Sequence, residues 1–119
     1  MITSHNHSSF TISNLARSVA FYRNILGFTV EQQFEVEGAS VEQITALPGA
    51  HLKVAHLLLG NFRLELIEYM SPRGHFTDLS TNNVGSAHIA FYTDDIEKTY
   101  HELREKGTEF RGAPVAGRA

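Results

Sequence analysis

Two histidines stand at equivalent places in this chain, and imidazole is the side chain that most readily binds a metal or moves a proton near neutral pH. "HSSFTISNLARSVAFYRNILGF" begins at His7, and "HIAFYTDDIEKTYHELREKGTEF" begins at His88. The two stretches share few identities, yet their layouts superpose with a constant offset of 81 residues, which maps Asn14 onto Asp95. A histidine kept in register with a whole supersecondary unit indicates more than chance.

A second pair of chemically competent residues is predicted to meet across a hairpin. "HLKVAHLLLGNFRLELIEY" reads as two strands joined at Gly60-Asn61, a typical two-residue turn, and in that register His56 opposes Glu65. One face is apolar throughout and is expected to be covered by helices: Ala55, Leu57, Leu59, Phe62, Leu64 and Leu66. The other face carries the imidazole and the carboxylate, with Val54, Leu58, Arg63 and Ile67. Polar chemistry on the face away from the helices is unusual enough to mark a candidate site.

The elements that must position these residues follow from periodicity. Residues 8–12 alternate as a half-buried strand, Ser13 or Asn14 offers a helix N-cap, and apolar residues at 15, 19, 22 and 26 follow helical spacing up to Gly27. Residues 28–34 resume strand-like alternation.

The second stretch repeats this order. It predicts a strand over 88–92, a cap at Asp94 or Asp95, a helix that ends near Gly107, and a strand that begins over 108–111. Together the two stretches indicate an internal duplication of a β-α-β unit. The predicted organisation is a single α+β domain over 1–119, with a β-α-β-β-β module over 1–70, a linker over 71–85 and a partial second module over 86–119. By the 81-residue offset the second hairpin would begin beyond Ala119.

Composition excludes several classes of function. The 119 residues carry a formal net charge of −3 with no concentration of Lys and Arg, so neither nucleic acid nor an anionic membrane is expected as a partner. The absence of cysteine rules out disulfides and thiolate metal sites. No apolar run approaches a membrane span and the N-terminus lacks a signal-peptide pattern, so a cytoplasmic location is expected.

These motifs resemble the vicinal oxygen chelate superfamily, the group of glyoxalases, bleomycin resistance proteins and extradiol dioxygenases. The opening pattern there is a histidine, an alternating strand, an Asp-Leu-like pair and Phe-Tyr before Leu-Gly-Phe. In this chain those positions are His7, Asn14-Leu15, Phe21-Tyr22 and Leu26-Gly27-Phe28. "LELIEY" is similar to the ligand-bearing fourth strand of the family, and the stretch from His88 is similar to its second module.

The resemblance implies paired β-α-β-β-β modules that form a curved mixed sheet around a cleft with one divalent metal. The ligands it implies are His7, Glu65 and His88. A fourth, usually a glutamate, would fall about 27 residues beyond Ala119 by the same offset. Either the chain is a shortened form or the protein works with an incomplete site. Two imidazoles and a carboxylate suit Zn, Ni, Co, Mn or Fe, and their type does not choose among these metals.

The remaining candidates have two readings each. His56 is predicted to be catalytic together with Glu65, or to orient that carboxylate, against the alternative of a cleft-facing residue without a role. Arg63 is predicted to bind an anionic substrate, against the alternative of pairing with a nearby acid. Tyr92, on the strand face of His88, is predicted to contact substrate. His5 is the alternative ligand to His7 because it shares the same strand parity. Other polar residues are expected to be incidental: Glu68 leaving the sheet, His51 and His75 in loops, and His101 on an exposed helix face.

The predicted function is a divalent-metal-dependent lyase or isomerase of the glyoxalase type, including the acyl-coenzyme A epimerase-like branch. A metal there stabilises an enediolate while a carboxylate moves the proton next to a carbonyl. Two alternatives stay open: an extradiol-type ring-cleaving dioxygenase, and a metal-free protein that binds a small molecule such as an antibiotic. A homodimer is expected, because a partial second module leaves an unpaired sheet edge.

Overall fold

The computed structural model describes residues 1–117, and the chain divides into two compact units, Met1–His75 and Phe76–Ala119. The division falls inside the predicted linker 71–85, while the module boundaries at 70 and 86 stay a prediction. No helix in the described part of the chain is long and apolar enough to cross a membrane.

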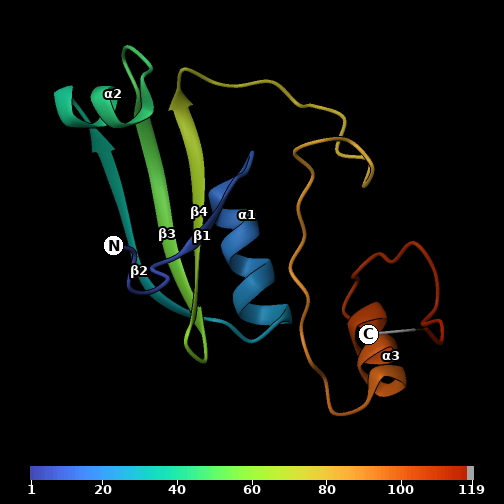
Figure 1. Ribbon diagram of the computed structural model, residues 1–119. Coiled ribbons are helices and arrows are strands. Elements are labelled where there is room, and N and C mark those ends of the chain that lie inside the picture. The colour runs from blue at the N-terminus through green and yellow to red at the C-terminus, as the bar shows by residue number, and fades with distance from the viewer. Residues whose placement is uncertain (118–119) are drawn as a thin grey trace. The chain divides into compact units, whose positions relative to one another are not determined.

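The first unit is built on one four-stranded mixed sheet, shown in Figure 1. Its strands are β1 (Ser8–Thr11), β2 (Thr29–Glu37), β3 (His51–Leu59) and β4 (Phe62–Ser71). They lie in the order β1-β4-β3-β2, with β1 parallel to β4 and the other pairs antiparallel. With helix α1 (Leu15–Ala20) between the first two strands, the unit has the predicted β-α-β-β-β order, and the α+β class is confirmed.

The hairpin forms in the predicted register. Leu59 pairs with Phe62 beside the Gly60-Asn61 turn, and His56 pairs with Glu65. Gly60 has a φ of +59°, a conformation that glycine adopts without steric cost. The predicted apolar face is the core, because Ala55, Leu57, Leu64 and Leu66 are fully buried.

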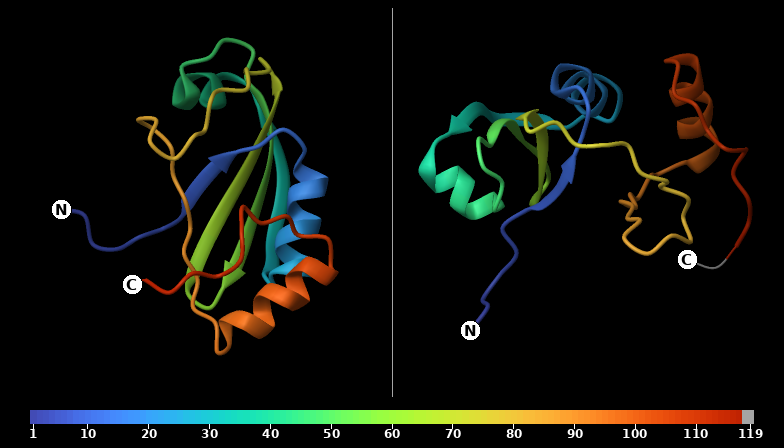
Figure 2. Two further views of the ribbon diagram at one scale, coloured as in Figure 1. Left: turned by 90° about the vertical axis from the view of Figure 1, so that its right-hand side faces the viewer. Right: turned by 90° about the horizontal axis from the view of Figure 1, so that it is seen from above.

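Helix α1 covers this apolar face, as the two views of Figure 2 show. It begins where predicted, since the Asn14 side chain accepts a hydrogen bond from the backbone N–H of Arg17, and it buries Leu15 and Val19 against the sheet. The backbone N–H of Leu15 donates to Glu68 at 2.8 Å. The expectation that Glu68 leaves the sheet is therefore wrong. Glu68 lies within β4 on the helix side, where a carboxylate stabilises the first turn of α1.

The first helix continues as a wider π-helical turn, η1 (Phe21–Ile25), before Gly27 ends it at a φ of +82°. A π-helical turn accommodates one residue more than the corresponding α-helical turn. In the second copy the same interval, from Leu103 to Gly107, is one residue shorter than the interval from Tyr22 to Gly27. The offset of 81 residues between the two copies therefore changes by one residue within this turn.

A short helix, α2 (Ala39–Thr45), joins β2 to β3 at one end of the sheet (Figure 1). The sequence analysis did not predict it. It lies over a smaller apolar cluster in which Ala50, Leu52 and Val54 are buried and partly buried residues surround them: Val36, Val41, Ile67 and Tyr69. Leu52 and Val54 share the strand parity of His56, so the face opposite α1 is apolar near α2 and polar farther along.

The second unit contains α3 (Ile96–Glu105), which confirms the predicted helix of the second copy. The Asp95 side chain caps it by accepting from the Lys98 backbone N–H, with φ and ψ of −149° and 101°, against −150° and 102° at Asn14. The predicted strands are wrong, since neither 88–92 nor 108–111 forms a strand. Strands are maintained by hydrogen bonds to a neighbouring strand, and the described residues of this unit include none.

Candidate functional site

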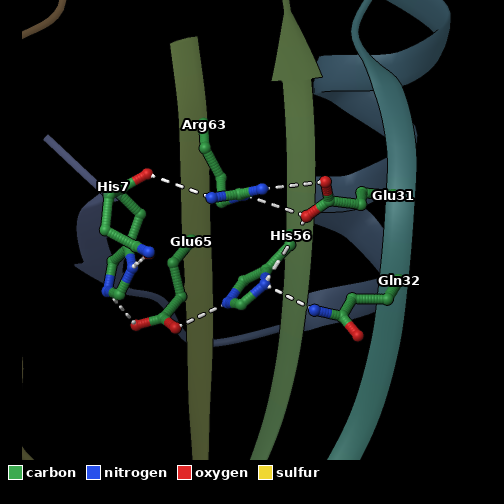
Figure 3. Close-up of polar contacts among 7 residues, drawn as sticks. His7, Glu31, Gln32, His56, Arg63 and Glu65 are labelled. Carbon is green, nitrogen blue, oxygen red and sulfur yellow. Dashed lines mark hydrogen bonds and ion pairs between the residues drawn. The ribbon is translucent and has the colours of Figure 1, made fainter. Parts of the chain in front are cut away.

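The carboxylate of Glu65 lies between two imidazoles, one on each of its oxygens, as Figure 3 shows. Its Oε2 is 2.7 Å from Nε2 of His56, and its Oε1 is 3.3 Å from Nε2 of His7. The side chains of Glu65 and His56 are 15% and 13% exposed, so both groups are largely removed from water. The two rings stack with their centroids 5.7 Å apart. Three of the sequence-predicted site residues are therefore in one cluster.

The hydrogen bond between Gln32 and Nδ1 of His56 defines the tautomer of His56. Nε2 of Gln32 lies 2.9 Å from Nδ1 of His56, and an amide nitrogen can only donate. Nδ1 therefore accepts, and a neutral imidazole then carries its single proton on Nε2, where it donates to Glu65. The ring also contacts Phe34 edge-on, with centroids 5.5 Å apart.

His7 has the opposite tautomer. Its Nδ1 is 2.6 Å from Oδ1 of Asn6, an oxygen that can only accept, so Nδ1 carries the proton. Nε2 of His7 then carries no proton, and its lone pair faces Oε1 of Glu65. Two electron-rich atoms 3.3 Å apart repel each other, and a cation placed between them would relieve this repulsion.

An irregularity in β2 supplies two polar residues that the sequence analysis did not identify. Val30 pairs with Leu57 and Gln32 pairs with His56, so Glu31 is an extra residue in the ladder, a β-bulge. The bulge turns both Glu31 and Gln32 toward the polar face. The signal in the sequence was the polar run at 31–33, which interrupts the alternation between Val30 and Phe34.

Arg63 forms an ion pair with Glu31 across the sheet. Its Nε and one terminal nitrogen donate to the two carboxylate oxygens at 2.9 and 3.0 Å, and its other terminal nitrogen donates to the backbone carbonyl of Asn6 at 3.3 Å. The contact with a nearby acid, one of the two alternatives for Arg63, is thus present, and substrate binding by Arg63 stays a prediction. Through Asn6 the ion pair connects back to His7, which faces Glu65.

This ion pair predicts a measurable pKa. The hydrogen bonds from Arg63, and then its positive charge, lower the pKa of the Glu31 carboxyl below its ordinary value of 4.5. Because the folded pKa is the lower one, the stabilisation is fully present above about pH 4.5 and is lost as the pH falls through the folded pKa. Side-chain carboxyl carbon shifts, followed by NMR titration, should show this depressed midpoint.

In Arg63→Met the midpoint of Glu31 should return toward 4.5. Arg17→Met is the matched control, since the Arg17 side chain contacts Ser13 instead of a carboxylate. A midpoint for Glu31 that does not change in Arg63→Met would contradict the ion pair.

The donor set fits a divalent metal. Nitrogen and oxygen ligands at about 2.0–2.2 Å from a shared ion lie roughly 3.0–3.4 Å from each other in tetrahedral or octahedral geometry. The separation of 3.3 Å between His7 Nε2 and Glu65 Oε1 matches this range. Within residues 1–117, no group of three or more His, Asp or Glu side chains is arranged to hold a metal ion together. The roles of His7 and Glu65 as metal ligands therefore stay predictions.

A family model for the glyoxalase/bleomycin resistance protein/dioxygenase superfamily matches residues 4–118. The chain belongs to this superfamily. Proteins of this superfamily commonly use a divalent metal ion, bind small molecules and are often dimers.

Known proteins resemble the chain along most of its length. Human mitochondrial methylmalonyl-CoA epimerase is 30% identical over 105 residues, which are 85% of this chain and 52% of the epimerase. The chain therefore spans about half the length of that relative. YwkD of Bacillus subtilis is 28% identical over 122 residues and is covered to 85%. The crystal structure of a glyoxalase family protein from Bacillus cereus matches with a TM-score of 0.79 and 22% identity, covering 99% of this chain and 81% of that one. This last likeness shows the shared fold.

The other predicted site residues of this superfamily member lie in the second unit. His88 and Tyr92 are both exposed in the extended segment before α3, and the Tyr92 side chain is fully accessible. Their roles as metal ligand and substrate contact stay predictions.

The alternative histidines lie elsewhere. His5 stacks on Phe62, on the helix side of the hairpin, with centroids 6.4 Å apart, so its shared parity with His7 does not bring it to the polar face. The expectation that His51 lies in a loop is wrong, because it begins β3 and contacts Glu35 at 2.9 Å. His75 and His101 are exposed.

Proposed function

We propose that this protein is a divalent-metal-dependent isomerase or lyase that moves a proton next to a carbonyl group of a small molecule. His7 and Glu65 would hold the metal, with His88 as the third ligand. The observation that carries the proposal is the separation of 3.3 Å between Nε2 of His7 and Oε1 of Glu65, which suits two ligands of a shared ion.

Each residue of the cluster would have a separate task. A metal at these donors would act as a Lewis acid toward a carbonyl oxygen. Glu65 would offer Oε1 as a ligand, while its Oε2 accepts a hydrogen bond from the Nε2–H group of His56. Low exposure of Glu65 and His56 limits competition from water, which strengthens these electrostatic interactions. Arg63 and Tyr92 would contact the substrate outside this pair.

The relatives support an acyl-coenzyme A thioester as the first substrate to test. The human relative is a methylmalonyl-CoA epimerase, and its likeness extends over 85% of this chain. The proton next to the thioester carbonyl of such a substrate is acidified when the carbonyl oxygen is bound by a Lewis acid. Epimerisation requires only that this proton be removed and replaced. The superfamily name also includes glyoxalases, so a glutathione hemithioacetal is the second substrate to test.

Deuterium uptake tests the proposal directly. The full chain, loaded in turn with Zn²⁺, Ni²⁺, Co²⁺, Mn²⁺ or Fe²⁺, is incubated with methylmalonyl-CoA in D₂O, and the substrate is analysed by mass spectrometry. Metal-dependent deuteration next to the carbonyl supports an isomerase. Conversion of the hemithioacetal without such exchange supports a lyase. Metal-dependent oxygen consumption with a catechol would contradict both and favour ring cleavage, and bleomycin binding without any turnover would favour a resistance protein.

Three further properties belong to the proposal. Each chain would bind one metal ion, and the proposal does not specify the element. A homodimer is proposed because members of the superfamily are often dimers, and a cytoplasmic location stays a prediction.

A further inference from the structure

A row of polar residues crosses all four strands at the level of Glu65. Ser9 on β1 pairs with Glu65 on β4, Glu65 pairs with His56 on β3, and His56 pairs with Gln32 on β2. Paired residues in a sheet direct their side chains to the same face, so these side chains are direct neighbours. Gln32 is in this row because the bulge at Glu31 sets its register.

We infer that Gln32 and His56 are positioning residues that orient the Glu65 carboxylate. The amide N–H of Gln32 keeps Nδ1 of His56 unprotonated, so His56 presents its proton to Oε2 of Glu65 and leaves Oε1 free toward His7. The assignment of Oε1 to a metal rests on the proposed function; the tautomer of His56 does not.

Glu31 is a competing acceptor for Nδ1 of His56, but Arg63 holds its carboxylate. Oε1 of Glu31 lies 3.9 Å from Nδ1 of His56 and could accept a proton from it. However, Arg63 donates to both oxygens of Glu31 at 2.9 and 3.0 Å. The amide of Gln32 is closer, at 2.9 Å. Donation from Gln32 to Nδ1 therefore determines the tautomer, and Arg63 contributes by holding Glu31.

The ring of His56 has little freedom to respond otherwise. Phe34 packs edge-on against it and His7 stacks on it, and its side chain is only 13% exposed. Groups that hydrogen-bond a ligating carboxylate fix its orientation, and their loss weakens metal affinity about 10–100-fold. A carboxylate held by its Oε2 offers the metal one oxygen rather than two.

The first test reads the imidazole nitrogens of the metal-free full chain by ¹⁵N NMR. In the wild type the proton of His56 should reside on Nε2. Gln32→Glu places an acceptor against Nδ1 and should move a proton onto that nitrogen. Gln33→Glu is the matched control, because Gln33 is adjacent but pairs with Ala55, and it should leave the tautomer unchanged. A wild-type His56 protonated on Nδ1 alone would overturn the inference.

The second test measures Zn²⁺ affinity by competition with a chelating dye. Gln32→Leu and His56→Leu should bind about 10–100-fold more weakly than the wild type. His56→Gln keeps an N–H for Glu65 and should recover part of this loss. Equal affinity in all variants would overturn the inference and leave the proposed function standing. Weakened affinity, with neither deuterium uptake nor hemithioacetal conversion by the wild type, would support the inference and contradict the proposed function. If the wild type binds no Zn²⁺, the competition is repeated with Ni²⁺, Co²⁺, Mn²⁺ and Fe²⁺; if it binds none of these metals, the proposed function fails, and the NMR result alone decides the inference.

Discussion

His7→Ala and Glu65→Gln should each reduce the bound divalent metal from about one per chain to nearly none. Each substitution removes one of the two proposed ligand atoms, Nε2 of His7 and Oε1 of Glu65, which are 3.3 Å apart. Glu65→Gln keeps the size of the side chain but replaces an anionic oxygen ligand with a neutral amide. Because a bound metal contributes several kcal/mol of transition-state stabilisation, metal-dependent deuterium uptake should fall by about a hundredfold or more.

Elemental mass spectrometry on protein purified without chelators measures the metal content. His5→Ala is the matched control, since His5 is two residues from His7 but stacks on Phe62 instead of facing Glu65. His88→Ala tests the ligand proposed from the second unit. If His5→Ala loses the metal and His7→Ala keeps it, the assignment of the site is wrong. Circular dichroism of each variant separates loss of a ligand from loss of the fold.

Leu57→Ala should be among the most destabilising substitutions in the hairpin, lowering the free energy of unfolding by about 2–5 kcal/mol. The Leu57 side chain is fully buried and pairs with the equally buried Leu64 beneath helix α1. Truncation removes buried methyl groups and leaves a cavity that the surrounding sheet and helix fill only in part. Since small domains have only about 5–15 kcal/mol of stability, this loss is a large fraction of the total.

Urea unfolding followed by circular dichroism measures this change, and Leu59→Ala is its matched control. Leu59 is in the same strand with the same parity, but it is 38% exposed beside the turn. Its truncation should cost well under half as much as that of Leu57. Similar midpoints for the two variants would contradict the assignment of Leu57 to the core.

The features predicted correctly depend on local rules. Asn14 and Asp95 cap their helices because a short polar side chain reaches the free backbone N–H groups of the first turn. The Gly60-Asn61 turn sets the hairpin register, and that register places His56 opposite Glu65. The positions of His56 on β3 and Glu65 on β4 could therefore both be predicted from the period-two alternation of these strands.

The missed features depend on contacts between distant segments. The bulge at Glu31 exists only relative to β3, and the sequence shows it merely as a run of polar residues. Without the bulge, Gln32 could not be placed beside His56. Glu68 has the parity of core residues, and its role became clear only when the start of α1 was found above it. The strand predicted at 88–92 had the right alternation but found no neighbouring strand among the described residues of its unit.

The wide turn at Phe21–Ile25 lies where the predicted correspondence between the two stretches of the chain changes by one residue. A single-residue indel in a regular α-helix rotates everything after it by about 100°, which would turn buried residues toward solvent. A wider turn accommodates an extra residue locally, and Phe28, which directly precedes β2, is buried. The helix caps at Asn14 and Asp95, rather than sequence identities, are therefore the landmarks for aligning the two stretches. The interval between Tyr22 and Gly27 is the place to expect a difference in length between them.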